Sequence, residues 1–108
     1  MDRERLVAER ALVDSQVAAL TKDFDAIVYS TELVSTDDEH DPDGATIAFE
    51  RAMIISLLDR AKDQRNELDA ALRRFDAGTY GRCEGCGREV ASARLEMLPA
   101  TRVCIACA

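Results

Sequence analysis

Four cysteines near the C-terminal end of this 108-residue chain carry its clearest chemistry. They form two pairs, Cys83 with Cys86 and Cys104 with Cys107, and seventeen residues separate the pairs. Thiolates at this C-x2-C…C-x2-C spacing are typical of a tetrahedral zinc site. Because four sulfurs close the coordination sphere and leave no position for water, we predict one structural zinc ion rather than a catalytic one.

Two other uses of the cysteines are two disulfides or a redox-active C-x-x-C pair. The chain opens on Met1-Asp-Arg-Glu-Arg and shows no apolar segment of the signal-peptide kind, so an oxidising compartment is not indicated. No apolar run is long enough to span a bilayer. We therefore expect a cytoplasmic, zinc-binding protein, in which Gly85 and Gly87 give the first cysteine turn its backbone freedom.

The charge balance narrows the choice of partner. Acidic residues number 21 against 14 basic ones, a formal net charge of -7, and lysine occurs only at Lys22 and Lys62. Direct DNA binding normally needs a basic stripe, because phosphate contacts dominate the affinity. The sequence instead favours a basic protein surface or a metal ion as partner. We predict no enzymatic activity, since no Ser/His/Asp or Cys/His set can be assembled around the single histidine, His40, once the cysteines hold metal.

Two long stretches carry the seven-residue spacing of helices packed by coiled-coil rules. The first, residues 2 to about 34, has apolar rows at Leu6, Val13, Leu20, Ile27 and Val34 and at Val17 and Phe24. The second, residues 45 to about 77, has rows at Ile47, Ile54, Ala61, Leu68 and Phe75 and at Leu58 and Leu72. The rows are broken by Arg10, Arg51 and Arg65, which we expect to pair with Asp14, Asp69 or a neighbouring glutamate.

A short polar segment joins the two stretches, and Asp41-Pro42-Asp43-Gly44 within it has the composition of a turn. A short connection makes consecutive helices antiparallel neighbours. The predicted fold is mainly α: a long antiparallel two-helix coiled-coil hairpin over residues 1–77, with an acidic tip at about 35–46. A small four-cysteine zinc module follows at residues 78–108, with a short helical segment around 93–97.

These features together resemble the DksA/TraR family of bacterial transcription factors. The resemblance rests on Gly78-Thr-Tyr-Gly-Arg-Cys-Glu-Gly-Cys-Gly87, on Arg94-Leu-Glu-Met-Leu-Pro99 and on the second cysteine pair. It implies a regulator that binds RNA polymerase rather than DNA. The family's hairpin enters the secondary channel of the polymerase, and acidic residues at its tip act near the catalytic region, often together with guanosine tetraphosphate.

The family's tip motif, D-x-x-D-x-A, fits this chain in part. Counted back from Cys83 without gaps, its second Asp falls on Asp43 and its Ala on Ala45, while its first Asp falls on His40, next to Asp41. The resemblance therefore implies Asp43 first, and then Asp41, as the acids that act near the polymerase active site. From composition alone, both aspartates are also ordinary turn formers.

The family's alarmone-binding residues do not match. In the same register its three basic positions fall on Glu67, Leu98 and Ala108. An acid and two apolar side chains replace three cations that would face a polyanion. We therefore expect that the chain does not bind guanosine tetraphosphate through these positions.

Two alternatives to polymerase binding stay open from the sequence. One is a zinc-stapled helical adaptor or dimerisation protein, and the chain is compatible with a monomer or a homodimer. The other is a divalent-metal site at the tip, because Glu39, Asp41, Asp43, Gly44 and Glu50 nearly spell a calcium-binding EF-hand loop. The EF-hand pattern is weakened by glutamate at its first position and threonine at its eighth.

Overall fold

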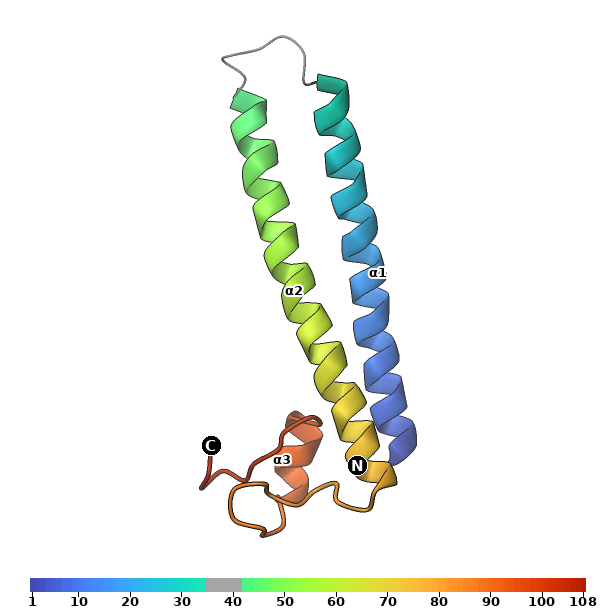
Figure 1. The fold of residues 1–108 in the computed structure, drawn as a ribbon, viewed down its shortest axis with the longest axis vertical. Coiled ribbons are helices and arrows are strands. Elements are labelled where there is room, and N and C mark those ends of the chain that lie inside the picture. Colours follow the sequence, from blue (N-terminus) through green and yellow to red (C-terminus); the bar gives the residue numbers. More distant parts are fainter. Residues whose placement is uncertain (35–41) are drawn as a thin grey trace.

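A computed structural model describes residues 1–34 and 42–108, except for the side chains of residues 31–34, 42 and 43. It contains three helices, α1 (Arg3–Val34), α2 (Pro42–Asp76) and α3 (Ser92–Met97), and within the described part of the chain no strand beyond one isolated bridge. Figure 1 shows α1 and α2 side by side as an antiparallel hairpin, with α3 and the C-terminal loops packed at its base. The predicted mainly α hairpin with a small appended module is confirmed.

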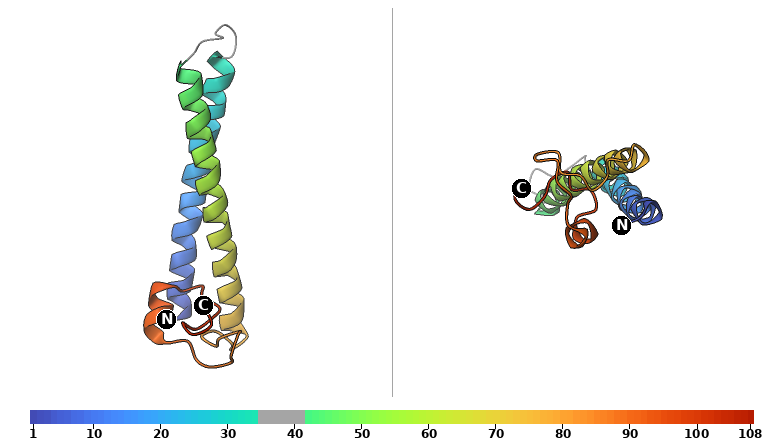
Figure 2. Two further views of the ribbon diagram at one scale, coloured as in Figure 1. Left: turned by 90° about the vertical axis from the view of Figure 1, so that its left-hand side faces the viewer. Right: turned by 90° about the horizontal axis from the view of Figure 1, so that it is seen from below.

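The molecule is a rod. Its principal extents are 62 × 27 × 19 Å, and the views of Figure 2 show that the helices run along the long axis while the C-terminal module adds width only at one end. At 1.5 Å per residue, α1 alone is about 48 Å long. No helix among the described residues combines the length and the apolar content that crossing a membrane requires.

The two long helices begin on local signals. The Asp2 carboxylate accepts a hydrogen bond from the backbone N–H of Arg5 at 2.8 Å, which makes Asp2 the N-cap of α1. Helix α2 begins at Pro42, three residues before the predicted start. The expected turn at 41–44 is therefore wrong from Pro42 onward. Proline is favoured at the first helical position, because its fixed φ suits a helix and its missing N–H would have no partner there.

The buried part of the helix seam lies at the base of the hairpin. Its buried members come from both predicted heptad rows and are Leu6, Val13, Val17, Ala61 and Leu68, joined by Ala71. Towards the tip, seam residues such as Phe24, Ile27, Ile47 and Ile54 are only half-buried. Ala71 has no exposed surface at all, although the heptad pattern does not indicate it, because an alanine gives little signal in a pattern of large apolar residues.

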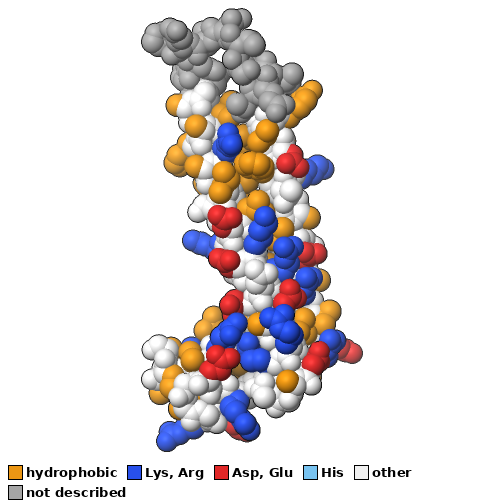
Figure 3. Space-filling model, viewed as in Figure 1, with side chains coloured by type: hydrophobic (Ala, Val, Ile, Leu, Met, Phe, Trp, Pro, Cys, Tyr) orange, Lys and Arg blue, Asp and Glu red, His pale blue; other side chains and the backbone are white. Residues whose placement is uncertain are grey.

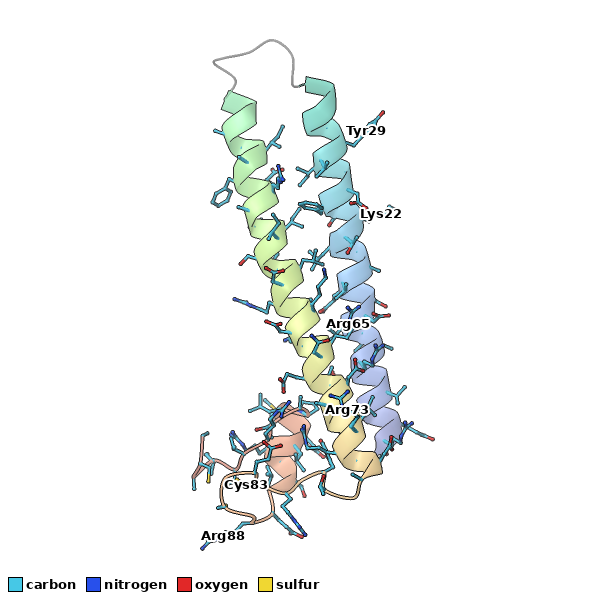
Figure 4. The ribbon with its side chains drawn as sticks, viewed as in Figure 1. Lys22, Tyr29, Arg65, Arg73, Cys83 and Arg88 are labelled. Atoms are coloured by element: carbon cyan, nitrogen blue, oxygen red, sulfur yellow. The ribbon has the colours of Figure 1, made fainter. Side chains whose placement is uncertain are left out.

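Two of the three arginines that interrupt the seam pair across it with the expected acids. Arg10 binds Asp69, and Arg65 binds Asp14 with its Nη1 2.9 Å from the carboxylate oxygen. Figure 4 shows Arg65 reaching from α2 towards α1. Such partly exposed pairs contribute about 0–1 kcal/mol each, so their main effect is to fix which turn of α1 faces which turn of α2.

Arg51 departs from this expectation. Its guanidinium lies over the ring of Phe24, 5.8 Å from the ring centroid. A cation over an aromatic face is attracted by the ring quadrupole, with a stabilisation of about 0.5–1 kcal/mol at exposed sites. In the upper seam, an aromatic ring thus takes the place of the acidic partner that the sequence suggested.

Helix α2 ends in the glycine signal that the sequence predicted. Gly78 has φ +78°, the backbone N–H of Thr79 binds the carbonyl of Arg74 at 2.9 Å, and that of Gly78 binds the carbonyl of Phe75 at 3.1 Å. This pair of bonds is a Schellman motif, which satisfies the last helical carbonyls and turns the chain away from the helix axis. The turn directs the chain from the hairpin into the cysteine module.

The burial gradient predicts where substitutions destabilise the hairpin. Leu6→Ala should lower the free energy of unfolding by about 2–5 kcal/mol, because the side chain is fully buried and its removal leaves a cavity. Leu12→Ala is the matched control: Leu12 lies on the same helix with 63% of its surface exposed, and its change should stay within about 0.5 kcal/mol. Urea unfolding followed by circular dichroism measures both, and equal effects would contradict the assignment of the core to the base.

Candidate metal centre

Short backbone hydrogen bonds shape the two cysteine turns. In the first turn, the N–H of Cys83 binds the carbonyl of Arg88 at 2.8 Å, and the N–H of Val90 binds that of Gly81 at 2.7 Å. Gly87, with φ +75°, closes this narrow loop in a conformation that other residues rarely adopt. The N–H of Glu84 binds the carbonyl of Arg102 at 2.8 Å. This last bond holds the second cysteine turn against the first.

The four cysteine sulfurs meet at one point. All four Sγ atoms lie within 4.8 Å of one another, and those of Cys86 and Cys104 are 3.7 Å apart. Zinc–sulfur bonds of about 2.3 Å in a tetrahedron place the sulfurs about 3.8 Å apart, whereas a disulfide needs about 2.05 Å. The cysteines are free thiols rather than disulfides, and the cluster fits one structural zinc held by Cys83, Cys86, Cys104 and Cys107, as predicted.

The surroundings of Cys83 favour its thiolate. This side chain is almost fully buried, and its sulfur accepts the backbone N–H groups of Cys104 at 3.2 Å and Gly85 at 3.3 Å. The N–H of Cys104 is the main reason that the pKa of Cys83 falls to about 6. The crowding of sulfurs acts in the opposite direction on Cys107, whose pKa is raised chiefly by its hydrogen bond with Cys104. A dication removes this conflict, because its charge keeps four adjacent thiolates deprotonated.

Gly85 is required for space rather than for backbone freedom. A Cβ atom at this position would lie 3.0 Å from Sγ and 3.2 Å from Cβ of Cys107. Its φ is not among the positive ones, which belong to Gly78, Gly81 and Gly87. The sequence interpretation of Gly85 as a flexible position is therefore wrong, whereas that of Gly87 is confirmed. Glycine at 85 lets the second cysteine pair approach the first.

The module docks on the base of the hairpin through Tyr80. Its ring lies 5.7 Å from that of Phe75, and its hydroxyl donates to the carbonyl of Pro99 at 2.8 Å. Burial raises the pKa of this hydroxyl, so it stays a donor. Met1 and Tyr80 pack against both the hairpin core and the module's own small core of Cys83, Val90 and Leu95. The hairpin and the module are therefore joined by side chains that pack into both hydrophobic cores.

Arg102 forms a second link between the two parts. Its Nε lies 3.1 Å from Glu67 of α2, and its Nη1 lies 3.8 Å from Glu84 in the first cysteine turn. Arg74 adds a hydrogen bond from its guanidinium to the carbonyl of Ala100 at 3.3 Å. The pKa of Arg74 is lowered mainly by burial, and in second place by repulsion from the positive charge of Arg102. Sequence reasoning missed this link, because residues 67 and 102 are distant in the chain.

The predicted tip residues are not assembled into a described site. Asp41 lies outside the described residues, Asp43 belongs to the first turn of α2 but its side chain is likewise outside them, and Ala45 is exposed. Their roles remain predictions. The EF-hand alternative is wrong, because its loop would span residues 39–50 and the backbone is helical from Pro42 onward. Nine of the twelve loop positions, residues 42–50, lie on helix α2, and positions along a continuous helix cannot wrap around a calcium ion as that loop does.

Loss of one thiolate should release the metal and loosen the base. We expect wild-type protein to carry one zinc ion per chain and Cys83→Ser to carry much less, with residues 78–108 losing protection from amide hydrogen exchange. Elemental analysis and hydrogen-exchange mass spectrometry measure these two effects. Treatment of the wild type with a zinc chelator should reproduce the exchange pattern of the variant. Full zinc occupancy of Cys83→Ser would contradict the four-sulfur assignment.

Two glycine substitutions separate space from backbone conformation. Gly85→Ala should weaken zinc binding at least tenfold, since the added methyl group meets the Cys107 side chain. Gly78→Ala is the matched control, because a Cβ atom there has no neighbour within 4 Å while its φ is +78°. It should lower stability by about 1 kcal/mol through backbone strain and leave zinc affinity unchanged. Competition with a chromophoric chelator measures the affinities, and an unaffected Gly85→Ala would refute the steric argument.

Comparison with known proteins agrees with this geometry. Residues 78–108 match the family model of the prokaryotic dksA/traR C4-type zinc finger. The chain is 24% identical over 107 residues to the RNA polymerase-binding transcription factor DksA of Haemophilus influenzae, an alignment that covers 99% of this chain and 74% of that protein. It is also 50% identical over 42 residues to an uncharacterized protein of Aquifex aeolicus, covering 39% of this chain and 29% of that one.

The whole fold also has a solved counterpart. The structure of transcription factor DksA2 from Pseudomonas aeruginosa superposes with a TM-score of 0.81 at 23% identity, over 97% of this chain and 75% of that one. The chain spans less than a third of the Aquifex aeolicus protein and about three-quarters of the two DksA proteins. Residues 78–108 thus carry a C4-type zinc finger of the dksA/traR kind, and the chain as a whole shares the fold of DksA2.

Proposed function

We propose that this protein is a non-enzymatic regulator of transcription that binds RNA polymerase. The observation that carries the proposal is the alignment along 99% of the chain with a protein named as an RNA polymerase-binding transcription factor. The same hairpin and zinc module are present here, so the parts for the same kind of contact are available. In this proposal the protein acts in the cytoplasm, and the zinc ion fixes the module against the hairpin rather than taking part in chemistry.

The shape and charge of the molecule support entry into a channel. The hairpin is narrow and long, with extents of 62 × 27 × 19 Å for the whole molecule, and the sequence between its helices holds Asp37, Asp38, Glu39 and Asp41. A negative tip on a stiff stalk is attracted by a basic, metal-bearing channel. We propose that the tip enters the secondary channel of the polymerase and that Asp43, with Asp41 and Ala45, acts close to the active site.

We further propose that guanosine tetraphosphate has no pocket built on residues 67, 98 and 108. The carboxylate of Glu67 is held by Arg102 at 3.1 Å, so this position presents an ion pair instead of a free cation. Leu98, which is 49% exposed, presents an apolar side chain there. A polyanion would lose its water there without gaining the charge partners that compensate for desolvation.

Binding to core RNA polymerase, with and without a protein that already occupies the secondary channel, tests the proposal. We expect saturable binding that the occupant abolishes by competition. Fluorescence anisotropy of a label attached near the C-terminal end of the chain reports the complex without altering the tip. Absence of binding by zinc-loaded protein would contradict the proposed function and favour the adaptor alternative.

A single charge should separate binding from regulation. Asp43→Asn should leave polymerase affinity nearly unchanged while the effect on initiation falls at least tenfold, because the proposed contact forms only near the active site. Asp59→Asn, at an exposed acid lower on α2, is the control and should keep full effect. In vitro transcription at several promoters gives the readout. Equal potency of both variants would show that the tip charge has no role.

A further inference from the structure

The upper part of α2 is apolar around more of its circumference than the hairpin can cover. Between Gly44 and Leu58 only Glu50 and Arg51 are charged. Besides the seam residues, Phe49, Met53 and Leu57 are exposed, with 70%, 48% and 41% of their surface open. Figure 3 shows hydrophobic side chains gathered over the upper part of the hairpin. A helix that is apolar on most sides normally lies buried between neighbours, and α1 provides only one.

These exposed residues form one stripe. Phe49, Met53, Leu57, Arg60 and Gln64 follow one another at intervals of three or four residues, so they lie along one side of α2. From Phe49 to Gln64 this stripe is about 22 Å long. It is as long as a partner helix of about four turns.

Two grooves continue the stripe towards the base. The upper groove, of about 340 Å³, lies between α1 and α2 and is lined by Leu57, Arg60 and Gln64 with Gln16, Ala19 and Leu20. The lower groove, of about 610 Å³, lies between the hairpin and the module, where Met97, Leu98 and Pro99 form its apolar wall. Because Arg60 and Gln64 line both grooves, the surface is continuous from Phe49 to the zinc module.

The charges of the lower groove are mainly negative. Glu9, Asp63 and Glu67 line it, and the one basic residue of the lining is Arg60. Arg102 already pairs with Glu67, so Glu9 and Asp63 are the acids that a partner would meet, and Met97 keeps 81% of its surface exposed beside them. A second copy of the chain would bring the same acids and another net charge of -7 to this surface. Like charges brought together oppose association. The complementary occupant is apolar along one side and basic at the end that meets the module.

We propose that this surface, the stripe with its two grooves, binds an amphipathic α-helix of a partner protein. The apolar row of that helix packs on Phe49, Met53 and Leu57, and its lysines or arginines lie against Glu9 and Asp63 beside the module. Docking an amphipathic helix in an apolar groove is a common recognition mode, in which spaced apolar anchors give affinity. The inference concerns the chemistry of the surface and does not depend on which protein carries the helix.

A pair of synthetic helical peptides of 18 residues tests the inference with the zinc-loaded protein. Both carry leucine at the same helical positions, and the remaining positions are mainly lysine in one peptide and glutamate in the other. We expect the lysine peptide to bind and the glutamate peptide to bind at least thirtyfold more weakly. Met53→Ser and Leu57→Ser should each reduce affinity for the lysine peptide at least fivefold, and Asp63→Lys at least tenfold.

Leu12→Ser is the matched control, because Leu12 is an exposed leucine of α1 outside both grooves. It should leave peptide affinity unchanged. A loss equal to that of Leu57→Ser, or equal binding of both peptides, would overturn the inference. Sedimentation of the free protein distinguishes a partner helix from a second copy of the chain. If the protein is a dimer and Leu57→Ser makes it monomeric, the surface is the dimer interface and the inference is overturned. All these outcomes are independent of polymerase binding, so the two proposals fail separately.

Discussion

Coordination of one metal ion by four cysteines is the constraint on which the lower half of this molecule depends. The module of about 30 residues buries only Cys83, Val90 and Leu95 of its own, too little to fold a segment of that length by hydrophobic burial alone. Four sulfurs within 4.8 Å of one another would repel as thiolates without a cation between them. Metal binding therefore supplies both the cross-link and the charge that hold the two cysteine turns together.

The organised module in turn closes the open end of the helix seam. Tyr80 packs on Phe75 and binds the carbonyl of Pro99, while Arg102 joins Glu67 of α2 to Glu84 of the first cysteine turn. The seam side chains are most buried at this end, so the two helices are packed most tightly at the base and less tightly towards the tip. The far end of such a hairpin is held in place by its rigid base rather than by a thick hydrophobic core along its length.

Ion pairs inside the molecule also decide what the surface offers to a partner. Arg10 pairs with Asp69, Arg65 with Asp14, and Arg102 with Glu67. These pairs take cations out of reach of an anionic ligand, which agrees with the general excess of negative charge. In Figure 4, Arg88 points away from the module and Lys22 and Tyr29 away from the hairpin. The apolar stripe of α2 is instead continuous with the grooves that lead to the module.

The sequence by itself determined the parts that repeat or that follow local rules. Cysteine spacing identified the metal ligands, heptad spacing identified the two helices and most of their buried rows, and Gly78 marked the end of α2, because each signal acts within a few neighbouring residues. The partners of Arg10 and Arg65 followed from the same periodicity.

Only the tertiary structure decided the rest. The need for glycine at 85 and the ion pair of Arg102 with Glu67 depend on segments brought together from distant parts of the chain. The burial of Ala71 depends on packing between the helices, to which local composition gives little signal.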